Sequence, residues 1–181
     1  MEVHSTPLEG LLIISPNIFK DERGYFFESY RQDILKINGF TDSFMQDNES
    51  KSQRGVMRGL HFQNPPFAQA KLVRVVRGGI LDVVVDIRNS SETYGQYFSI
   101  KLTGETKQML LIPVGFAHGF MTLEDNTIVN YKSSNVYNKN SEGTLLWDDK
   151  TLDIDWGENH PVLSDKDLQG EPFDSFNSLF D

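Results

Sequence analysis

The stretch from Ile80 to Arg88 alternates between apolar and charged residues, and this alternation limits the fold of the chain more than any other feature. One side of the alternation is aliphatic and the other is charged: Val83, Val85 and Ile87 against Asp82, Asp86 and Arg88. A period of two residues is typical of a β-strand, because successive side chains of a strand point to opposite faces. We therefore expect a strand here, after a turn at Gly78 and Gly79.

More short strands are predicted along the middle of the chain. They cover residues 71–76, 97–102, 109–112 and 127–133. Turn-forming segments such as Asn89-Ser90-Ser91 and Thr103-Gly104-Glu105 separate some of them. Short strands at this spacing favour an antiparallel sandwich or barrel, so the predicted fold class is all-β.

The segment 29–40 is the best candidate for a helix. Ser29 and Gln32 have the spacing of a capping box, and Gly39 suits the end of a helix. Its apolar side would be formed by Ile34, Leu35 and Ile37. We expect helices to be few, short and peripheral.

Length and composition exclude several classes of protein. A chain of 181 residues fits one domain, residues 1–181, with an irregular acidic cover from about residue 141 in which Trp147 and Trp156 pack. The formal net charge of -9 argues against nucleic-acid binding, and the count of zero cysteines excludes disulfides and cysteine-ligated zinc. No signal peptide is visible, and no apolar run approaches the roughly 20 residues of a membrane-spanning helix. The expected location is cytoplasmic, away from membranes.

Positive charge is concentrated between residues 54 and 77 of this acidic chain. The cluster consists of Arg54, Arg58, Lys71, Arg74 and Arg77. In a strand Lys71 and Arg74 point to opposite faces, so the cluster does not line one pocket as a whole. One interpretation is that its members are solvated surface residues. The other is that some of them bind a diphosphate, because a guanidinium group can hold two phosphate oxygens at once.

Two histidines lie in distinctive surroundings. His61 follows Arg58-Gly59-Leu60, and an imidazole is the side chain best suited to accept a proton near neutral pH. His118 lies in Pro113-Val114-Gly115-Phe116-Ala117-His118-Gly119-Phe120, where two glycines and a proline predict a tight loop. Both histidines could also be structural. A metal site built from both and a carboxylate is a further alternative, although Phe62 and Gln63 replace the His-x-His pair common in cupins.

Two tyrosines, Tyr131 and Tyr137, flank a polar stretch near the end of the predicted sheet region. Tyrosines at strand ends are mostly packing residues. A phenol also serves as a general acid, and its ring stacks on a nucleobase. Both readings stay open on the residues alone.

These stretches together resemble the dTDP-4-dehydrorhamnose 3,5-epimerase family. The resemblance extends from Arg23-Gly24-Tyr25-Phe26-Phe27-Glu28 to Ser164-Asp165-Lys166-Asp167 and includes, in order, Gln46-Asp47-Asn48, Arg58-Gly59-Leu60-His61-Phe62-Gln63, Lys71 to Gly78, Asp82 to Arg88 and Pro113 to Phe120. It implies a cupin-like jelly-roll sandwich and a homodimer. It also implies conversion of dTDP-4-dehydro-6-deoxy-D-glucose to dTDP-4-dehydro-L-rhamnose, as in dTDP-rhamnose biosynthesis, by an isomerase that needs no metal or other cofactor.

The resemblance also implies a role for each matching residue. His61 matches the proton acceptor, Asp167 its carboxylate partner, and Tyr131 the proton donor. Lys71 matches the residue beside the 4-keto oxygen, and Tyr137 the ring that stacks on thymine. Arg23, Phe26 and Glu28 would reach the nucleotide by strand exchange across the dimer. The remaining substrate-binding positions would be Gln46, Asp47, Asn48, Arg58, His118, Glu142 and Lys166.

The chain departs from the family pattern at Glu49, where many members have histidine, and in its tail from Pro172 to Asp181. Neither touches a residue assigned to chemistry. Three alternatives stay open: a related enzyme that inverts C3 alone on another dTDP-4-keto deoxysugar, a metal-dependent cupin enzyme, and a sugar-binding sandwich without activity.

Overall fold

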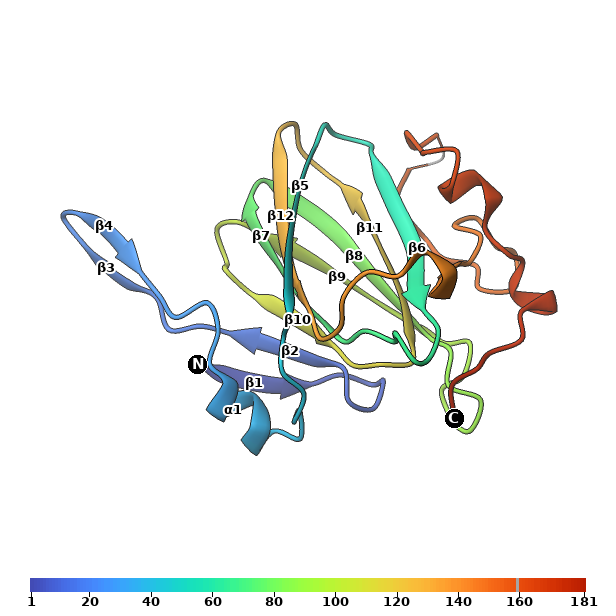
Figure 1. The fold of residues 1–181 in the computed structure, drawn as a ribbon. Coiled ribbons are helices and arrows are strands. Elements are labelled where there is room, and N and C mark those ends of the chain that lie inside the picture. The colour runs from blue at the N-terminus through green and yellow to red at the C-terminus, as the bar shows by residue number, and fades with distance from the viewer. Residues whose placement is uncertain (159) are drawn as a thin grey trace.

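Two antiparallel β-sheets stacked face to face form the body of the protein (Figure 1). The computed structural model describes residues 1–158 and 160–181. Within these residues the six-stranded sheet has the order β1-β2-β10-β7-β12-β5, and the five-stranded sheet has the order β13-β6-β11-β8-β9. The strands are β1 (Glu2–Ser5), β2 (Leu12–Ser15), β5 (Gln46–Ser52), β6 (Met57–Gln63), β7 (Lys71–Arg77), β8 (Gly79–Asp86), β9 (Tyr97–Thr103), β10 (Met109–Ile112), β11 (Phe116–Thr122), β12 (Thr127–Ser133) and β13 (Glu142–Thr144).

The strands from β5 to β12 follow the path of a jelly roll. Strands β5, β12, β7 and β10 lie side by side in one sheet, and β6, β11, β8 and β9 lie side by side in the other. The chain therefore crosses repeatedly between the sheets, as two interleaved Greek keys do. The predicted all-β jelly-roll sandwich is confirmed.

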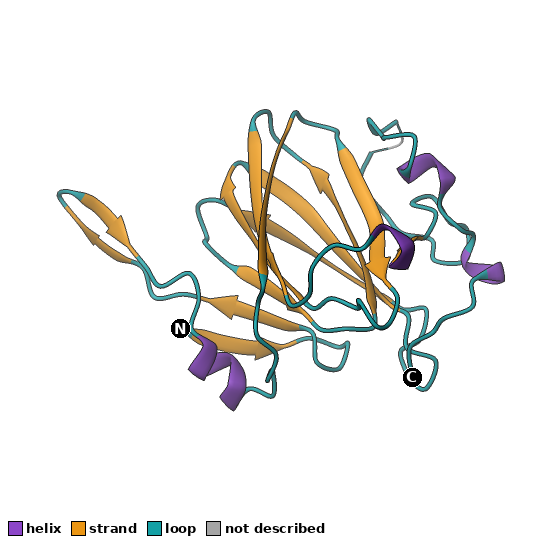
Figure 2. Cartoon of the chain, viewed as in Figure 1, coloured by secondary structure: helices purple, strands orange, loops and turns teal. Residues whose placement is uncertain are grey.

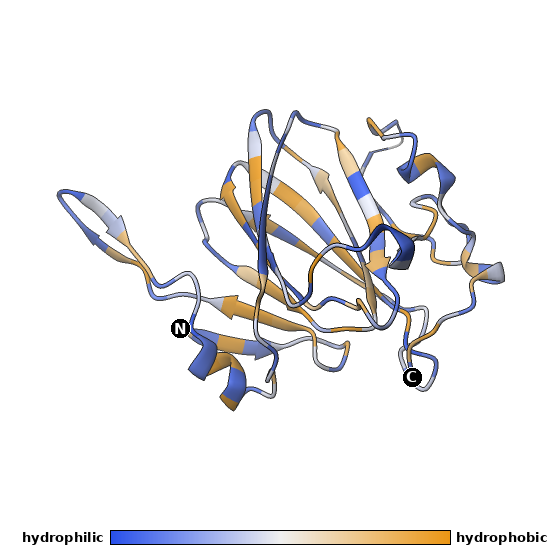
Figure 3. Ribbon diagram, in the orientation of Figure 1, coloured by the Kyte–Doolittle hydropathy of each residue, from blue (hydrophilic) through white to orange (hydrophobic). Residues whose placement is uncertain are grey.

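The main core fills the space between the sheets. Val73, Val75 and Val129 come from the six-stranded sheet, and they pack in one buried cluster with Ile80 and Val84 of the other. Figure 3 shows the corresponding alternation of hydrophobic and polar residues along the central strands, whereas β5 is mostly hydrophilic. Burial of this apolar surface is the main force that holds the two sheets together.

Both faces of β8 are buried, which the alternation of its residues does not reveal. Val83 and Val85 pack against the C-terminal segment on the outer face of the sheet. Asp82 and Asp86 point to the inner face, and each has a relative exposure of 0%. The charged side of the predicted strand thus lies inside the sandwich, where each carboxylate needs partners.

The C-terminal segment covers the outer face of the five-stranded sheet. Trp156 is buried and donates from Nε1 to the carbonyl of Trp147 at 2.7 Å, which confirms that the two tryptophans pack. In the tail, Phe176 meets Phe62 edge to face at 5.4 Å between ring centroids, and Phe180 is buried beside it. Figure 2 shows the short helices of this segment at the periphery. They are η2 (Asp167–Gln169) and η3 (Phe173–Ser175), whereas η1 (Lys139–Ser141) directly precedes β13.

The predicted helix at 29–40 exists but is shorter. Helix α1 spans Gln32–Ile37, and its N-cap is Arg31, which makes no side-chain cap. Ser29 therefore does not form the predicted capping box. Instead the Arg31 guanidinium binds the carboxylate of Asp33 in the first turn, with Nε 2.8 Å from Oδ1.

Two strands that carry polar residues or glycine were not predicted from the sequence. Strands β5 and β6 carry Gln46-Asp47-Asn48 and Gly59, and neither was predicted as a strand. The tight loop expected around His118 is limited to a turn at Val114 and Gly115, and the prediction is wrong for His118, which lies in the middle of strand β11. Gly119 serves a close approach there: a Cβ on Gly59 would lie 2.4 Å from the Cα of Gly119.

A hairpin of β3 (Phe19–Asp21) and β4 (Gly24–Phe26) projects away from the body (Figure 1). Its aromatic side chains are unusually open: Phe19 is 62%, Tyr25 58% and Phe26 66% exposed. An exposed cluster of large apolar side chains marks a surface for interaction. No described helix is long and apolar enough to cross a bilayer.

Candidate functional site

A cleft between the two sheets gathers most of the predicted chemistry. Its walls come from β5, β7 and β12 of the six-stranded sheet and from β6 and β13 of the five-stranded sheet. Its lining residues are Gln46, Asn48, His61, Phe62, Gln63, Gln69, Lys71, Tyr131, Ser133, Tyr137 and Glu142.

Strand register explains why these side chains meet. Tyr131 is paired with Asn48 on one side, and Ser133 is paired with Lys71 on the other, so these side chains share the inner face of their sheet. In the opposite sheet His61 is paired directly with His118. The histidine and the tyrosine therefore enter the cleft from opposite sheets.

His61 and Asp167 form a close pair. Nε2 of His61 lies 2.7 Å from Oδ1 of Asp167, whose side chain is only 4% exposed. The carboxylate is held by further donors: the Gly59 amide binds Oδ1 at 3.2 Å, and the Ser164 hydroxyl binds Oδ2 at 2.6 Å. The pair can therefore hold an imidazole in one orientation and stabilise it when it gains a proton.

The surroundings in the cleft lower the pKa of both members of this pair. Burial lowers the pKa of His61 below 6.5, and the nearby Lys166 and Lys71 cations lower it further, while the bond to Asp167 acts in the opposite direction. For Asp167, burial raises the pKa, but the bonds from His61 and Ser164 prevail and bring it to about 2. At neutral pH the site thus holds a neutral imidazole beside a carboxylate, which is the state that a general base requires.

Lys71 places a cation at the inner end of the cleft. Its ammonium donates to the carbonyl of His61, with Nζ and O 3.3 Å apart. Burial lowers the pKa of Lys71 to about 8, and the charge of Asp82 opposes this effect. The ammonium is therefore still mostly protonated at neutral pH and is able to stabilise an oxyanion.

Tyr131 supplies a phenol on the other wall. Burial raises its pKa above 10, and the charge of Arg58 counteracts this in part. The hydroxyl is therefore protonated at neutral pH. Arg58 itself is anchored to the Ser52 hydroxyl, at 3.3 Å from both Nε and Nη2.

The mouth of the cleft is bordered by a chain of polar contacts. The Tyr137 hydroxyl donates to Oε2 of Glu142 at 3.3 Å, and Lys166 binds the other oxygen of this carboxylate. The Tyr137 amide donates to Gln46 Oε1 at 3.0 Å. The ring of Tyr137 is 56% exposed, so a flat ligand could stack on it.

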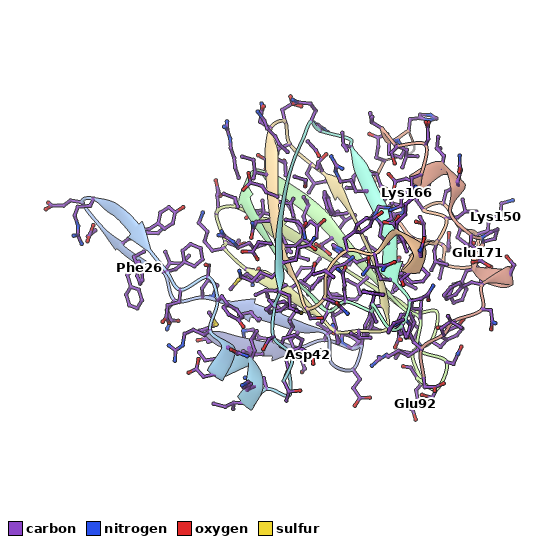
Figure 4. The ribbon with its side chains drawn as sticks, viewed as in Figure 1. Phe26, Asp42, Glu92, Lys150, Lys166 and Glu171 are labelled. Carbon is purple, nitrogen blue, oxygen red and sulfur yellow. The ribbon has the colours of Figure 1, made fainter. Side chains whose placement is uncertain are left out.

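The structure keeps some predicted residues out of this cleft. Arg23 and Phe26 lie on the projecting hairpin, far from Lys166 beside β6 (Figure 4). Glu28 pairs with Arg31 at 3.1 Å. Asp47 points away from Gln46 and Asn48, to the outer face of β5, where it pairs with Lys132 at 2.9 Å.

The basic cluster is divided as its strand parity predicts. Lys71 lines the cleft, whereas Arg74 is paired with Asn130 on the other face of its strand. Arg77 lines a separate hollow beside Gly78. Among the five cations of the cluster, Lys71 and Arg58 are therefore the two that act on cleft residues.

Sequence reasoning missed several residues of the site. Gln63 lies within a quoted motif, and its side chain accepts from the Asn138 amide at 2.7 Å. Ser164 holds the dyad carboxylate, and its position three residues before Asp167 was the available signal. Gln69 carries no signal in the sequence. Among the described residues, no group of three or more histidine, aspartate or glutamate side chains is arranged to hold a metal ion.

Comparisons of sequence and of structure with known proteins give the same result. The family model described as dTDP-4-dehydrorhamnose 3,5-epimerase matches residues 5–175. A dTDP-4-dehydrorhamnose 3,5-epimerase of Shigella flexneri is 48% identical over 174 residues, with 96% of each chain covered. The crystal structure of the Elizabethkingia anophelis dTDP-4-dehydrorhamnose 3,5-epimerase superposes with a TM-score of 0.94 at 43% identity, covering 98% of this chain and 99% of that one.

Two further structures bear on the ligand. An epimerase of Legionella pneumophila in complex with dTDP-4-keto-L-rhamnose has a TM-score of 0.93 at 42% identity, covering 97% of this chain and 94% of that one. A 3'-monoepimerase of Streptomyces bikiniensis in complex with dTDP-quinovose is less similar, at 31% identity and a TM-score of 0.88, covering 93% of this chain and 86% of that one.

Proposed function

This chain belongs to the dTDP-4-dehydrorhamnose 3,5-epimerase family and is an isomerase, and from that premise we propose how its residues carry out the reaction. It converts dTDP-4-dehydro-6-deoxy-D-glucose to dTDP-4-dehydro-L-rhamnose. The hydrogens on C3 and C5 are acidic because the carbanion left behind delocalises onto the 4-keto oxygen. The protein must therefore supply a base, a cation for that oxygen, and a proton from the opposite face.

His61 is the base in this proposal. Because Nε2 faces Asp167 at 2.7 Å, the other ring nitrogen is the one left to take the hydrogen. The imidazole becomes an imidazolium, which the Asp167 carboxylate stabilises. The electron pair of the C–H bond moves to the 4-keto oxygen, where the Lys71 ammonium meets the developing charge.

Tyr131 returns a proton to the carbon from the other side. The observation that carries the proposal is that His61 and Tyr131 enter one cleft from opposite sheets, on β6 and β12. A base and an acid on opposite sides of a sugar ring are what inversion requires. After each inversion the imidazolium loses its proton to water and the phenolate gains one, so solvent hydrogen enters the product.

The reaction in this proposal proceeds without metal or other cofactor, because the 4-keto group is itself the electron sink. The diphosphate and nucleoside supply binding energy away from the reacting carbons, which positions the ring. Tyr137, Glu142 and Lys166 lie at the mouth of the cleft, where the nucleotide would enter.

A homodimer is also part of the proposal. Arg23, Phe26 and Glu28 belong to the motifs shared with the family but lie outside the cleft of their own chain. The projecting hairpin, with Phe26 66% exposed, is suited to reach the cleft of a second copy. Light scattering of the purified chain tests this, and a monomeric mass at micromolar concentration would contradict it.

The chain is further proposed to be one cytoplasmic folding unit. Cell fractionation tests the location, and a single unfolding transition is expected for one domain.

The central experiment is conversion of the 4-keto sugar nucleotide in deuterated water, followed by NMR. We expect deuterium at both C3 and C5 of the product and the L-rhamno configuration. Deuterium and inversion at C3 alone would instead identify a monoepimerase. Activity that disappears with a chelator and returns with a metal ion would contradict the cofactor-free mechanism.

A further inference from the structure

Behind the cleft lies a second histidine–carboxylate pair that the mechanism above does not use. Nε2 of His118 lies 2.9 Å from Oδ1 of Asp82, on the neighbouring strands β11 and β8. Asp82 is 0% exposed and His118 only 6%. The pair lies on the inner face of the sheet, because His118 is also the direct cross-strand partner of His61.

Only one oxygen of the Asp82 carboxylate has a hydrogen-bond partner among the described residues. Oδ1 binds His118, whereas Oδ2 is buried and has no hydrogen-bond partner among the described residues. Burying a charged oxygen without a partner is costly, and such atoms in native structures usually serve a function. The charge of Asp82 acts on a cation of the cleft: Lys71, on the facing sheet.

We propose that Asp82 is a positioning residue of the epimerase, which keeps the Lys71 ammonium charged and the His118 ring fixed at the end of the cleft where the enolate oxygen forms. The inference rests on the function proposed above. Asp82 touches no reacting atom itself. It acts through Lys71 by charge across the gap between the sheets, and through His118 by a hydrogen bond.

The Lys71 ammonium is close to losing its proton near neutral pH. Burial lowers the pKa of Lys71 to about 8, and the negative charge of Asp82 is the largest effect in the opposite direction. Lysine is useful at the enolate oxygen only while it is charged. The charged groups that act on its ammonium are Asp82, Glu142 and Lys166. The ammonium also donates to the His61 carbonyl, Tyr131 lines the same cleft, and His118 binds Asp82.

The test is the pH dependence of kcat in Asp82→Asn, which keeps the shape of the side chain and removes its charge. We expect the basic limb of the profile, set by Lys71, to move to lower pH by about one unit, which is a tenfold change in the protonation equilibrium. At pH 8 kcat should then fall about fivefold, with KM nearly unchanged.

A matched control comes from the same strand. Asp86 is also 0% exposed on β8, but its carboxylate binds Arg88 at 2.6 Å, away from the cleft. Asp86→Asn should lose stability without moving the basic limb. In a Lys71→Arg background, whose guanidinium stays charged, Asp82→Asn should no longer shift the profile. If Asp82→Asn is not recovered folded, Asp82→Ser serves the same comparison.

The outcomes separate this inference from the function on which it rests. A wild-type chain that leaves the 4-keto sugar nucleotide unchanged would contradict the proposed function. A wild-type chain that epimerises, with an Asp82→Asn variant whose kcat and basic limb match it, would overturn the role of Asp82 alone. An equal shift of the basic limb in Asp86→Asn would also overturn the role of Asp82, because the loss of any buried charge on β8 would then have the same effect.

Discussion

Nε2 of His61 lies 2.7 Å from Oδ1 of Asp167, although His61 belongs to strand β6 of the jelly roll and Asp167 to η2 of the C-terminal segment. The pairing depends on the C-terminal segment, which folds back over β6 and brings η2 beside it. Hydrogen bonds from Gly59 and Ser164 then fix the carboxylate. The base is therefore oriented by a part of the chain that forms neither wall of the sandwich.

Replacing His61 by alanine should abolish proton removal. General acid–base groups contribute about 10²–10⁴-fold to the rate. Among the described residues that line the cleft, His61 is the only histidine, so no other imidazole there can replace it as the base. We expect both product formation and deuterium incorporation at C3 and C5 to fall by at least that factor, as measured by NMR in deuterated water. Exchange at the wild-type rate in His61→Ala would exclude His61 as the base.

Tyr131→Phe should separate exchange from inversion. The variant keeps the ring that packs against the core but lacks the hydroxyl that returns the proton. We expect formation of the L-rhamno product to drop about 10²-fold or more, while deuterium still exchanges at the first carbon through His61. An equal loss of exchange and inversion would argue against a donor role. Tyr97→Phe, a tyrosine that packs on the outer face of the other sheet, is the matched control.

Part of this fold is predictable from the sequence because some strands bury one clear face. The strands over 109–112 and 127–133 were predicted with their observed bounds, Met109–Ile112 and Thr127–Ser133. Strand β5 was not, because its inner side chains Gln46 and Asn48 are polar and line the cleft, while Asp47 on the outer face is polar as well. Strand β11 was misread as a loop, because Gly119 indicates a turn when in fact it lets β6 approach closely.

The chemistry of the residues alone suggested His61, Tyr131 and Tyr137, and the rest of the site was accessible only through the resemblance. Periodicity cannot show that Asp167 reaches His61, since no local pattern joins a strand to a 3₁₀ turn so distant in the chain. Asp82 was assigned to the charged side of its strand, and the alternation does not show that this side faces the inside of the sandwich. A jelly roll buries both faces of its central strands once a terminal segment covers the outer one, and a single strand does not reveal this.

Ser164→Ala should weaken the dyad without removing it. The Ser164 hydroxyl binds Oδ2 of Asp167 at 2.6 Å, and a hydrogen bond to a charged group is worth about 1.5–3 kcal/mol. We expect kcat to fall about tenfold with little change in KM, because Ser164 is not among the residues that line the cleft. Ser175→Ala, which removes an exposed hydroxyl bound to the Pro172 carbonyl, should leave kcat unchanged. A wild-type kcat in both variants would show that Asp167 needs no help from Ser164.

Asp167 should make the fold sensitive to acid. Its pKa in the folded protein is about 2, below its ordinary value of 3.8, so its contribution to stability is present above pH 4 and is lost as the pH falls toward 2. A shift of this size is worth about 2 kcal/mol. The free energy of unfolding, from urea titrations at pH 5 and pH 2.5, should therefore fall more for the wild type than for Asp167→Asn. Parallel losses in the two proteins would contradict this role.

The acid limb of kcat/KM should respond in opposite directions to the two charged neighbours of His61. His61 must be neutral to act as a base, and its pKa lies below 6.5, so activity should fall only below about pH 6.5. The Asp167 carboxylate raises this pKa and the Lys166 cation lowers it. Asp167→Asn should therefore move the acid limb to lower pH, and Lys166→Gln should move it to higher pH. The same direction of movement in both variants, or none in either, would mean that another group sets the limb, and His61 would lose its place as the titrating base.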